Sequence, residues 1–501
     1  MNIQEAEQEV VRTVRAYTAK NEMGEYLIPA ERQRPLLLIG PPGIGKTAIM
    51  EQAARECGVN LVSYTITHHT RQSAIGLPFL SEREYGGKKE TVTSYSMSEI
   101  IASVYDQIKK SGVQEGILFL DEINCVSETL APTMLQFLQY KTFGTHKLPE
   151  GFVIVTAGNP PQYNKSVREF DIVTLDRIRR LDIQEDLDVW KKYAAEAGIH
   201  GAVMAYLDIR KDHFYSIRTD VEHRYFVTAR GWEDLSRTIR VYEKLEMPVT
   251  EELVLEFLQD PEIARDFADY YELYRKYQDV YRIPEILEGT IREESLAVKN
   301  APFDEKLSLM GLLLDALRDD FRNYEEQKKV QEEILGTLKT LTEQIKAGKE
   351  AKASLKELVL EAEEETGREE EAGMLGRREL HEKHLSCSEL RGLEKLLAQE
   401  NREDGRENFA LCQGWFKERE EKRQKDNEMT GSHLTHAFEF LARCFGEGQE
   451  MVIFLSELSA DRRCVRFVSD CGNEAYFRYN KLLLLDEKRN QLTQEILQLM
   501  P

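Results

Sequence analysis

The sequence predicts an α/β fold: a parallel five-stranded sheet sandwiched by helices, followed by a helical domain, a long helical region and a small β-rich C-terminal module. Short apolar runs alternate with helical stretches between about residues 36 and 183. Such runs are typical of strands in a parallel sheet covered on both faces. Charged, helix-like sequence follows from about residue 303. The five expected strands are Leu36–Ile39, Leu61–Thr65, Ile117–Leu120, Phe152–Thr156 and Arg180–Ile183.

The chain of 501 residues is long enough for two or three domains. Its formal charge of −22 opposes non-specific binding along a nucleic-acid backbone, which needs a basic surface. The seven cysteines are scattered and form no CxxC pair, so we expect reduced thiols and a cytoplasmic protein. Neither a secretory leader nor an apolar run of about 18 residues is apparent, so we expect no membrane span.

Five parts are expected along the chain. They are an N-terminal helix at 1–30, the α/β core at 31–184, a helical domain at 185–300, a helical or coiled-coil extension at 301–430 and a small α+β module at 431–501. Within the helical domain, Trp232–Tyr242 and Glu251–Leu258 have helical apolar spacing, and Asp212–Tyr225 is expected to form a hairpin or a loop.

In the extension, Ile334, Leu338, Leu341 and Ile345 step by four, three and four residues, which is typical of a coiled coil or a helical hairpin. The glycine-containing, charged stretch 361–383 is expected to break or link two helices. Whether the extension docks on the core or projects from it stays open. Towards the end of the chain, Met451–Leu458, Cys464–Ser469 and Glu474–Tyr479 are expected to be strands because their pattern fits a period of two.

A glycine-rich loop follows the first predicted strand and opens a helix. Its glycines allow backbone N–H groups to turn inward around phosphates, and the helix start adds a favourable dipole. We expect Lys46 to reach the β- and γ-phosphates of a nucleotide and Thr47 to reach a magnesium ion. The loop consists of Gly40, Pro41, Pro42, Gly43, Ile44, Gly45, Lys46 and Thr47.

Two more polar sites follow predicted strands. Asp121 and Glu122 end the apolar run that starts at Ile117, at the sheet edge where ligands bind in such folds. Asp121 is expected to hold magnesium, and Glu122 to polarise the attacking water. Asn159 follows the next strand, where its amide can hold that water, although an asparagine at this place is often only a turn residue.

Residues 36–183 resemble the AAA+ superfamily, and most closely its MoxR-like, dynein-related branch. The strings that carry the resemblance are GPPGIGKT, LFLDEIN, TFGTHKLPEGF at 142–152, TAGNP and LDRI at 175–178. The resemblance covers roughly the first 290 residues and implies ATP hydrolysis with Mg²⁺. It also implies a helical lid domain at 185–300.

The resemblance assigns further residues. Arg177 matches the arginine that family members insert into the neighbouring subunit's ATP site, although Arg179 and Arg180 are close enough to take that role. Arg230 matches the sensor arginine at the start of a lid helix, and its alternative is an ordinary helix N-terminal arginine. An arginine that acts on the neighbouring subunit implies a homo-oligomeric ring, expected to be a hexamer.

The family also carries an insert and a hairpin, which map to about Thr70–Tyr95 and Tyr140–Gly151. His146 and Lys147 lie near the tip of the second. Both segments either face a central pore or pack against the next subunit. His68 and His69 are interpreted as structural, because no second ligand pair has metal-site spacing.

Three functions are open at this point. The first is an ATP-driven remodeller, acting in assembly or metal loading of a protein partner. The resemblance implies that this partner is of the von Willebrand factor A type. The second is a nucleic-acid-associated motor of the same clade, which the acidic charge disfavours. The third is a non-catalytic scaffold, which the intact set of expected site residues disfavours.

Overall fold

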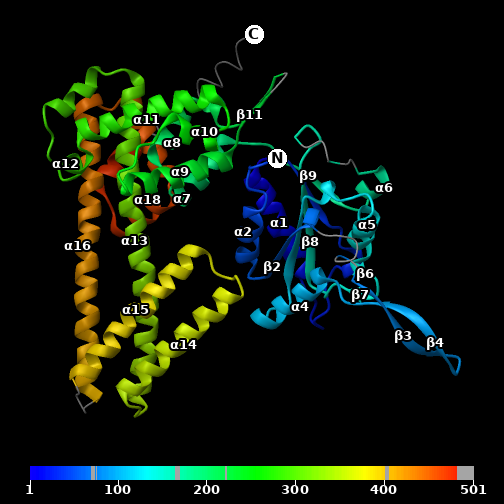
Figure 1. Cartoon of the computed structure of the whole chain (residues 1–501). Coiled ribbons are helices and arrows are strands. Elements are labelled where there is room, and N and C mark those ends of the chain that lie inside the picture. Colours follow the sequence, from blue (N-terminus) through cyan, green and yellow to red (C-terminus); the bar gives the residue numbers. More distant parts are fainter. Residues whose placement is uncertain are drawn as a thin grey trace, which may run out of the picture. The chain divides into compact units, whose positions relative to one another are not determined.

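The computed structural model describes residues 1–68, 74, 76–163, 167, 170–220, 223–400 and 405–481 (Figure 1). The chain folds as two compact units. The first comprises Met1–Val189 together with Glu363–Leu380, and the second comprises Trp190–Ala362 together with His381–Pro501.

A five-stranded sheet forms the centre of the first unit. Its strand order is β2-β5-β8-β1-β9, and all neighbouring pairs are parallel. The predicted α/β class and the five predicted strands are confirmed. The strands are β1 (Leu36–Ile39), β2 (Asn60–Thr65), β5 (Gly116–Asp121), β8 (Phe152–Gly158) and β9 (Arg179–Asp182).

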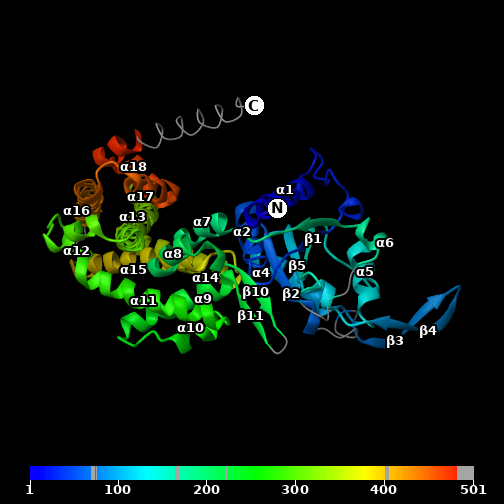
Figure 2. The same cartoon turned by 90° about the horizontal axis from the view of Figure 1, so that it is seen from above.

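Helices cover both faces of this sheet. Leu118 and Leu120 of β5 share a buried cluster with Ile101 of α4 (Glu99–Ser111) and Phe137 of α5 (Ala131–Tyr140). On the other face, α1 (Ile3–Thr18) and α2 (Ala48–Cys57) lie side by side (Figure 1, Figure 2). Because successive strand residues point to opposite faces, continuous apolar runs serve both layers.

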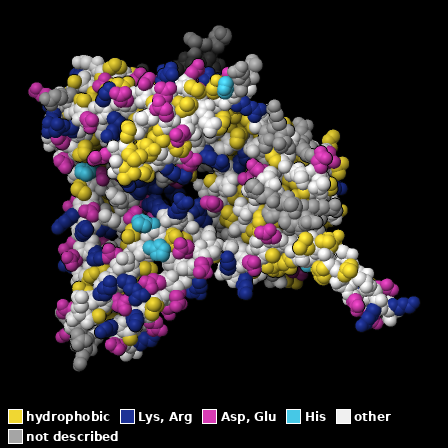
Figure 3. All heavy atoms as spheres, viewed as in Figure 1, with side chains coloured by type: hydrophobic (Ala, Val, Ile, Leu, Met, Phe, Trp, Pro, Cys, Tyr) yellow, Lys and Arg dark blue, Asp and Glu magenta, His cyan; other side chains and the backbone are white. Residues whose placement is uncertain are grey.

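Two hairpins extend from the first unit. β3 (Pro78–Tyr85) pairs with β4 (Lys88–Tyr95), and β6 (Thr142–Phe143) pairs with β7 (His146–Lys147). The β3–β4 hairpin projects, with apolar side chains near its base and charged ones near its tip (Figure 3). Shorter elements are α6 (Ile172–Leu175) and the 3-10 turns Ala30–Arg32, Ile66–His68 and Ile123–Cys125.

The second unit is helical apart from one antiparallel hairpin, β10 (Ser216–Thr219) with β11 (Arg224–Val227), where the sequence predicted a hairpin or loop. The hairpin lies among helices that include both predicted ones. None of the helices in the described ranges is both long and apolar enough to cross a membrane. The helices are α7 (Leu187–Ala197, shared with the first unit), α8 (Gly201–Ile209), α9 (Ala229–Lys244), α10 (Glu251–Phe257), α11 (Pro261–Tyr281) and α12 (Ile283–Leu287), with 3-10 turns at Lys211–His213 and Glu294–Asn300.

Four long helices make up the predicted extension. The predicted apolar stripe of the first one is buried in a cluster with side chains from the other three, so the helical part of that prediction is confirmed. α13 and α16 lie side by side (Figure 1, Figure 2). The expected break falls between the second and third helices. They are α13 (Phe303–Lys346), α14 (Ala351–Glu371), α15 (Arg377–Glu400) and α16 (Gly405–Phe445).

The predicted β-rich C-terminal module is wrong for the described residues, which form α17 (Gln449–Ala460), α18 (Arg462–Cys471) and a helix over 474–481. In α17, Met451, Phe454, Leu455 and Leu458 are buried, which is the spacing of a helical face. A short, continuous apolar run fits both periods, and the sequence interpretation chose the wrong one.

Residues 470–473 contain the end of α18 and the cap of the helix that follows it. Gly472 ends α18 with φ 75°, and the side chain of Asn473 accepts a hydrogen bond from Tyr476 N at 2.8 Å, at the start of the next helix. The same residue types favour hairpin turns, which is why the sequence did not distinguish the two.

A buried arginine fastens α18 to the second unit. Arg463 Nε donates to Glu325 Oε2 of α13 at 3.1 Å, and its Nη2 donates to Glu196 O of α7 at 2.6 Å. Only 7% of the Arg463 side chain is exposed. Arg466 pairs with the same carboxylate, but 38% of its side chain is exposed.

We predict that Arg463→Met lowers the free energy of unfolding by about 3 kcal/mol, because buried acceptors lose their charged donor. The matched Arg466→Met variant is expected to cost less than about 1 kcal/mol, as exposed pairs do. Urea unfolding followed by circular dichroism measures both. Equal, small effects would contradict the burial of α18 in this unit.

Candidate functional site

The loop Gly40–Thr47 joins the end of β1 to the start of α2, as predicted. Gly43 and Gly45 have φ of 75° and 95°, a region that side chains with a Cβ avoid. A Cβ at Gly40 would lie 2.9 Å from Ile183 O and 3.0 Å from Ile44 Cδ1. The loop therefore keeps its shape only with glycine at these positions.

Lys46 lies inside the loop, with 8% of the residue exposed. Its Nζ donates to Gly40 O at 2.8 Å, to Pro41 O at 2.7 Å and to Asn159 Oδ1 at 2.9 Å. The register of the sheet explains the last contact, because Ile39 of β1 pairs with Gly158 of β8. The structure thus joins two residues that the sequence predicted separately.

Thr47 and Asp121 meet at the same edge of the sheet. Thr47 Oγ1 donates to Asp121 Oδ2 at 3.3 Å, and Glu122 N donates to Asp121 Oδ1 at 2.8 Å. Hydroxyl and carboxylate oxygens are the hard ligands that Mg²⁺ prefers, and Mg²⁺ is usually held by one or two carboxylates plus substrate phosphates. The residues therefore fit the predicted ion.

Glu122 has a left-handed backbone, with φ 56° and ψ 34°. This conformation is uncommon for a residue other than glycine and costs about 1–3 kcal/mol. Its Oε2 accepts a hydrogen bond from Thr67 Oγ1 at 3.0 Å. Sequence reasoning missed Thr67. A hydroxyl residue just beyond β2 is the sequence signal that could have indicated it. β2 pairs with β5 and places Thr65 beside Asp121, so a residue shortly after Thr65 can reach Glu122.

Asn124 is the second residue that sequence reasoning missed, although it ends the quoted LFLDEIN string. It is 6% exposed, and its Nδ2 donates to Asn159 O at 2.8 Å. A cavity of about 680 Å³ opens at this edge. Its lining includes Gly40, Pro41, Asn124, Asn159, Arg180 and Asp182.

The three candidate arginines differ in their contacts. Arg177 is exposed, and its Nη1 donates to Gln139 Oε1 at 2.7 Å. Arg179 is half-buried and bonds to Thr13 and Glu9 of α1. Arg180 pairs with Asp182 of its own strand at 2.8 Å. Arg177 and Arg180 are therefore both accessible to another molecule, whereas Arg179 is engaged with α1.

Asp171 fixes the short helix that precedes Arg177. Its Oδ1 accepts from Thr174 N at 2.7 Å, which makes it the N-cap of α6. Hydrogen bonding from Thr174, with a smaller contribution from the charge of Arg177, lowers the pKa of the Asp171 carboxyl. The cap therefore stays ionised at neutral pH and favours the helix start.

Arg230 lies in the second unit, on α9, and is exposed. Thr228 caps that helix by accepting from Gly231 N at 3.2 Å. The predicted place at a helix start is confirmed. The predicted role towards a nucleotide concerns the other unit and stays a prediction.

The β6–β7 hairpin contains the two predicted contact residues. His146 Nε2 bonds to Tyr95 O at 3.0 Å, and Lys147 Nζ lies 3.7 Å from Glu31 and 3.6 Å from Glu150. Residues 70–73 and Ile75 of the predicted insert lie outside the described residues, as does His69, which the sequence analysis interpreted as structural. Facing a pore and packing against a neighbouring subunit both stay open for these segments.

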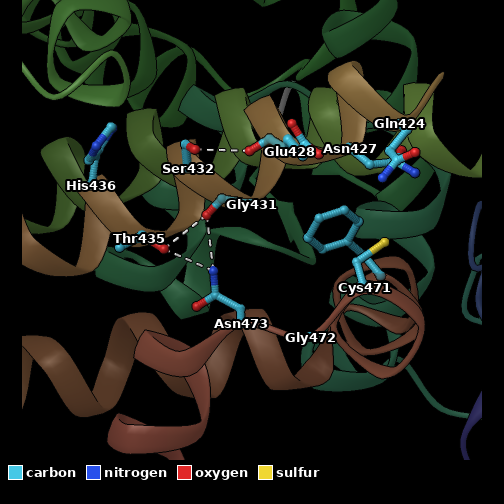
Figure 4. A pocket seen from close by; sticks show the side chains of 11 residues that line it. Gln424, Asn427, Glu428, Gly431, Ser432, Thr435, His436, Cys471, Gly472 and Asn473 are labelled. Atoms are coloured by element: carbon cyan, nitrogen blue, oxygen red, sulfur yellow. Dashed lines mark hydrogen bonds between the residues drawn. The ribbon is translucent and has the colours of Figure 1, made fainter. Parts of the chain in front are cut away.

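Another cavity, of about 570 Å³, lies in the second unit between α16 and α18 (Figure 4). Asn473 Nδ2 donates to Gly431 O and Thr435 Oγ1, both at 3.0 Å. Ser432 Oγ donates to Glu428 O at 2.9 Å. These bonds lie within α16 or join Asn473 to it, so they hold the walls of the cavity together. The residues predicted for phosphate chemistry all lie in other parts of the chain.

Comparison with known families identifies the class of this site. Residues 36–176 match the family described as "ATPase family associated with various cellular activities (AAA)". The chain therefore carries an AAA ATPase domain, a class of enzyme that binds and hydrolyses ATP, and its five-stranded sheet with flanking helices has the AAA+ fold.

A curated relative is the Lon protease of Endomicrobium trichonymphae, 29% identical over 194 residues. The match covers 35% of this chain and 22% of the relative, so the chain spans about a fifth of that protein. Two mutant forms of RuvB from Thermotoga maritima are among the similar solved structures. They are 14% and 13% identical, with TM-scores of 0.30 and 0.29, and the matches cover 52% and 57% of this chain and 70% and 77% of theirs.

Lys141, at the start of the β6–β7 hairpin, is buried and donates to a side-chain amide and a backbone carbonyl. Its Nζ donates to Gln33 Oε1 at 2.8 Å and to Phe152 O at 3.2 Å. Burial, followed by the charge of Lys147, lowers the pKa of Lys141 from 10.5 to about 8. Between pH 8 and 10.5 the unfolded chain therefore binds more protons at this site than the folded chain.

We predict that wild-type stability gains about 3 kcal/mol from Lys141 as pH rises across this window. Lys141→Met removes the titrating group. The difference in unfolding free energy between wild type and variant should therefore change with pH only between pH 8 and 10.5. Urea unfolding at pH 7, 8, 9 and 10 measures the gap. A gap that stays constant over these pH values would contradict the lowered pKa of the buried Lys141.

Proposed function

We propose that this chain is a MoxR-like AAA+ ATPase that works as a ring and couples ATP hydrolysis to remodelling, assembly or metal loading of a protein partner. The observation that carries the proposal is the meeting of four predicted residues at one sheet edge. Lys46 bonds Asn159 at 2.9 Å, and Thr47 bonds Asp121 at 3.3 Å. This arrangement supports a grip on a triphosphate with its metal ion.

The proposed roles follow from these contacts. The N–H groups of the glycine loop and the start of α2 hold the phosphates, and Lys46 reaches the β- and γ-phosphates. Thr47 and Asp121 hold Mg²⁺, which neutralises phosphate charge when bound. Glu122 polarises the attacking water, and Asn159 orients that water. Thr67 keeps the Glu122 carboxylate in place through its hydrogen bond.

Arg177 completes the site of a neighbouring subunit in this proposal. Its exposure and the cap at Asp171 support the choice over Arg179, whose guanidinium is engaged with α1. A guanidinium there stabilises charge that develops on the transferred phosphoryl group. The arrangement needs adjacent copies, so we infer a ring, taken to be a hexamer. Arg230 would report the γ-phosphate to the lid.

A protein is the partner that the surface supports best. Phe79 and Leu80 of the β3–β4 hairpin are 51% and 74% exposed, which is typical of a protein contact site. One relative is named a protease, which fits action on a polypeptide. The MoxR-like resemblance adds a von Willebrand factor A-type partner in the cytoplasm. The formal charge of −22 disfavours a nucleic-acid motor.

We predict that Glu122→Gln lowers the ATP turnover number at least about 100-fold while ATP still binds, because the water loses its base. Lys46→Ala should weaken ATP binding itself. Phosphate release and binding of a fluorescent ATP analogue measure the two effects. Glu115→Gln, a glutamate before β5 paired with Lys20, serves as the matched control. Turnover by Glu122→Gln at the control's rate would refute the assignment.

We predict that Arg177→Ala alone loses at least about 1000-fold in turnover. Mixing it with Glu122→Gln subunits should restore part of the activity, because the intact site of an Arg177→Ala subunit can then receive Arg177 from a Glu122→Gln neighbour. Arg180→Ala removes the alternative arginine, which pairs with Asp182 of its own strand, and it should keep more turnover than Arg177→Ala without mixing. Absence of rescue in verified mixed assemblies would count against action between subunits.

A further inference from the structure

Asn124 lies immediately behind the residues proposed to handle the γ-phosphate. It belongs to the 3-10 turn Ile123–Cys125 that follows Asp121 and Glu122. The side chain is directed at the end of β8, where its Nδ2 donates to Asn159 O at 2.8 Å. Only 6% of Asn124 is exposed, so water does not readily substitute for this bond.

Gly158 shows how closely the asparagine is seated. A Cβ at Gly158 would lie 2.4 Å from Asn124 Oδ1 and 2.9 Å from its Nδ2, closer than real Cβ atoms come. The φ of Gly158 is not positive, so the backbone at this position would accept a residue with a side chain. The close approach of Asn124 is therefore what requires glycine at this position.

The contacts form one continuous path. Asn124 holds the backbone of Asn159, and the Asn159 side chain accepts from Lys46 Nζ at 2.9 Å. Gly158 O in turn accepts from Gly40 N at 3.4 Å, at the start of the phosphate loop. A shift of Asn159 by a fraction of an ångström would therefore move its carboxamide relative to the lysine and the water it orients.

We propose that Asn124 is a positioning residue for phosphoryl transfer, which fixes the carboxamide of Asn159 against Lys46. It links the segment that carries Glu122 to the strand that carries Asn159, so that both groups keep their relative positions. The inference rests on the proposed ATP hydrolysis. It assigns Asn124 no contact with the nucleotide.

Asn124→Asp tests the hydrogen bond with little change of size, because an oxygen replaces the donor that faces Asn159 O. We expect kcat to fall at least about tenfold, with KM for ATP changed by less than about threefold. Asn60→Asp is the matched control. Asn60 is 1% exposed and also donates to a backbone carbonyl, Val113 O, at 2.8 Å, but it begins β2 at the opposite end of the strands. It should lower Tm without lowering kcat.

A double-mutant cycle separates positioning from general damage. In an Asn159→Ala background, Asn124→Asp should cost less than about twofold in kcat, because the residue it positions is already gone. An equal fold-loss in both backgrounds would overturn the inference, as would wild-type kcat in Asn124→Asp alone.

A second pair of variants keeps the test decisive if Asn124→Asp folds poorly. Gly158→Ala should lower Tm because its methyl group meets Asn124, and adding Asn124→Ala should restore Tm by making room. The double variant should remain slow in turnover. Recovery of both Tm and kcat would reduce Asn124 to a packing role and overturn the proposal.

The position of Asn159 supplies a readout that does not depend on turnover. A crystal structure of Asn124→Asp should show the Asn159 carboxamide displaced from Lys46, and an unmoved carboxamide would overturn the inference. If wild-type protein does not hydrolyse ATP, the proposed function fails, while this structure still decides whether Asn124 positions Asn159.

Discussion

The hydrogen bond from Lys46 to Asn159 joins the segments that follow two neighbouring strands, β1 and β8, at their carboxyl ends. It exists because β1 and β8 are neighbours in register, with Ile39 opposite Gly158. The same parallel arrangement places Asp121 one strand further along, within reach of Thr47. Helices on both faces bury the apolar side chains of these strands and so hold the ends in place. The polar edge is therefore a consequence of how the sheet is packed.

Each group at this edge has a neighbour that restricts it. Glycine at positions 43 and 45 permits the left-handed turns of the loop, and Thr67 holds the Glu122 carboxylate. Asp171 caps the short helix before Arg177. Because these side chains are already held in position, less free energy is needed to order them in each catalytic cycle. Strand ends and helix caps thus fix the positions of the loop side chains, although they take no part in the proposed reaction.

Much of this arrangement could be predicted from the sequence, because continuous apolar runs and a glycine–lysine loop have few alternative structures. The strand end at Ile39 followed from that pattern. The ends at Asp121 and Gly158 lie one and two residues beyond the predicted ends at Leu120 and Thr156. Thr67 and Asn124 could not be predicted, because their contacts depend on strand order and side-chain direction. The C-terminal helices were mistaken for strands, since the run at 451–458 fits both periods and Gly472 and Asn473 favour turns and helix caps alike.

In the proposed arrangement, one chain binds a triphosphate and a neighbouring chain completes the site. The most direct measurement is phosphate release from ATP with Mg²⁺ by the purified wild-type chain, followed over a wide range of protein concentration alongside its state of association. The account predicts turnover per chain that rises as chains associate. Absence of phosphate release at concentrations where the chains are associated would contradict it.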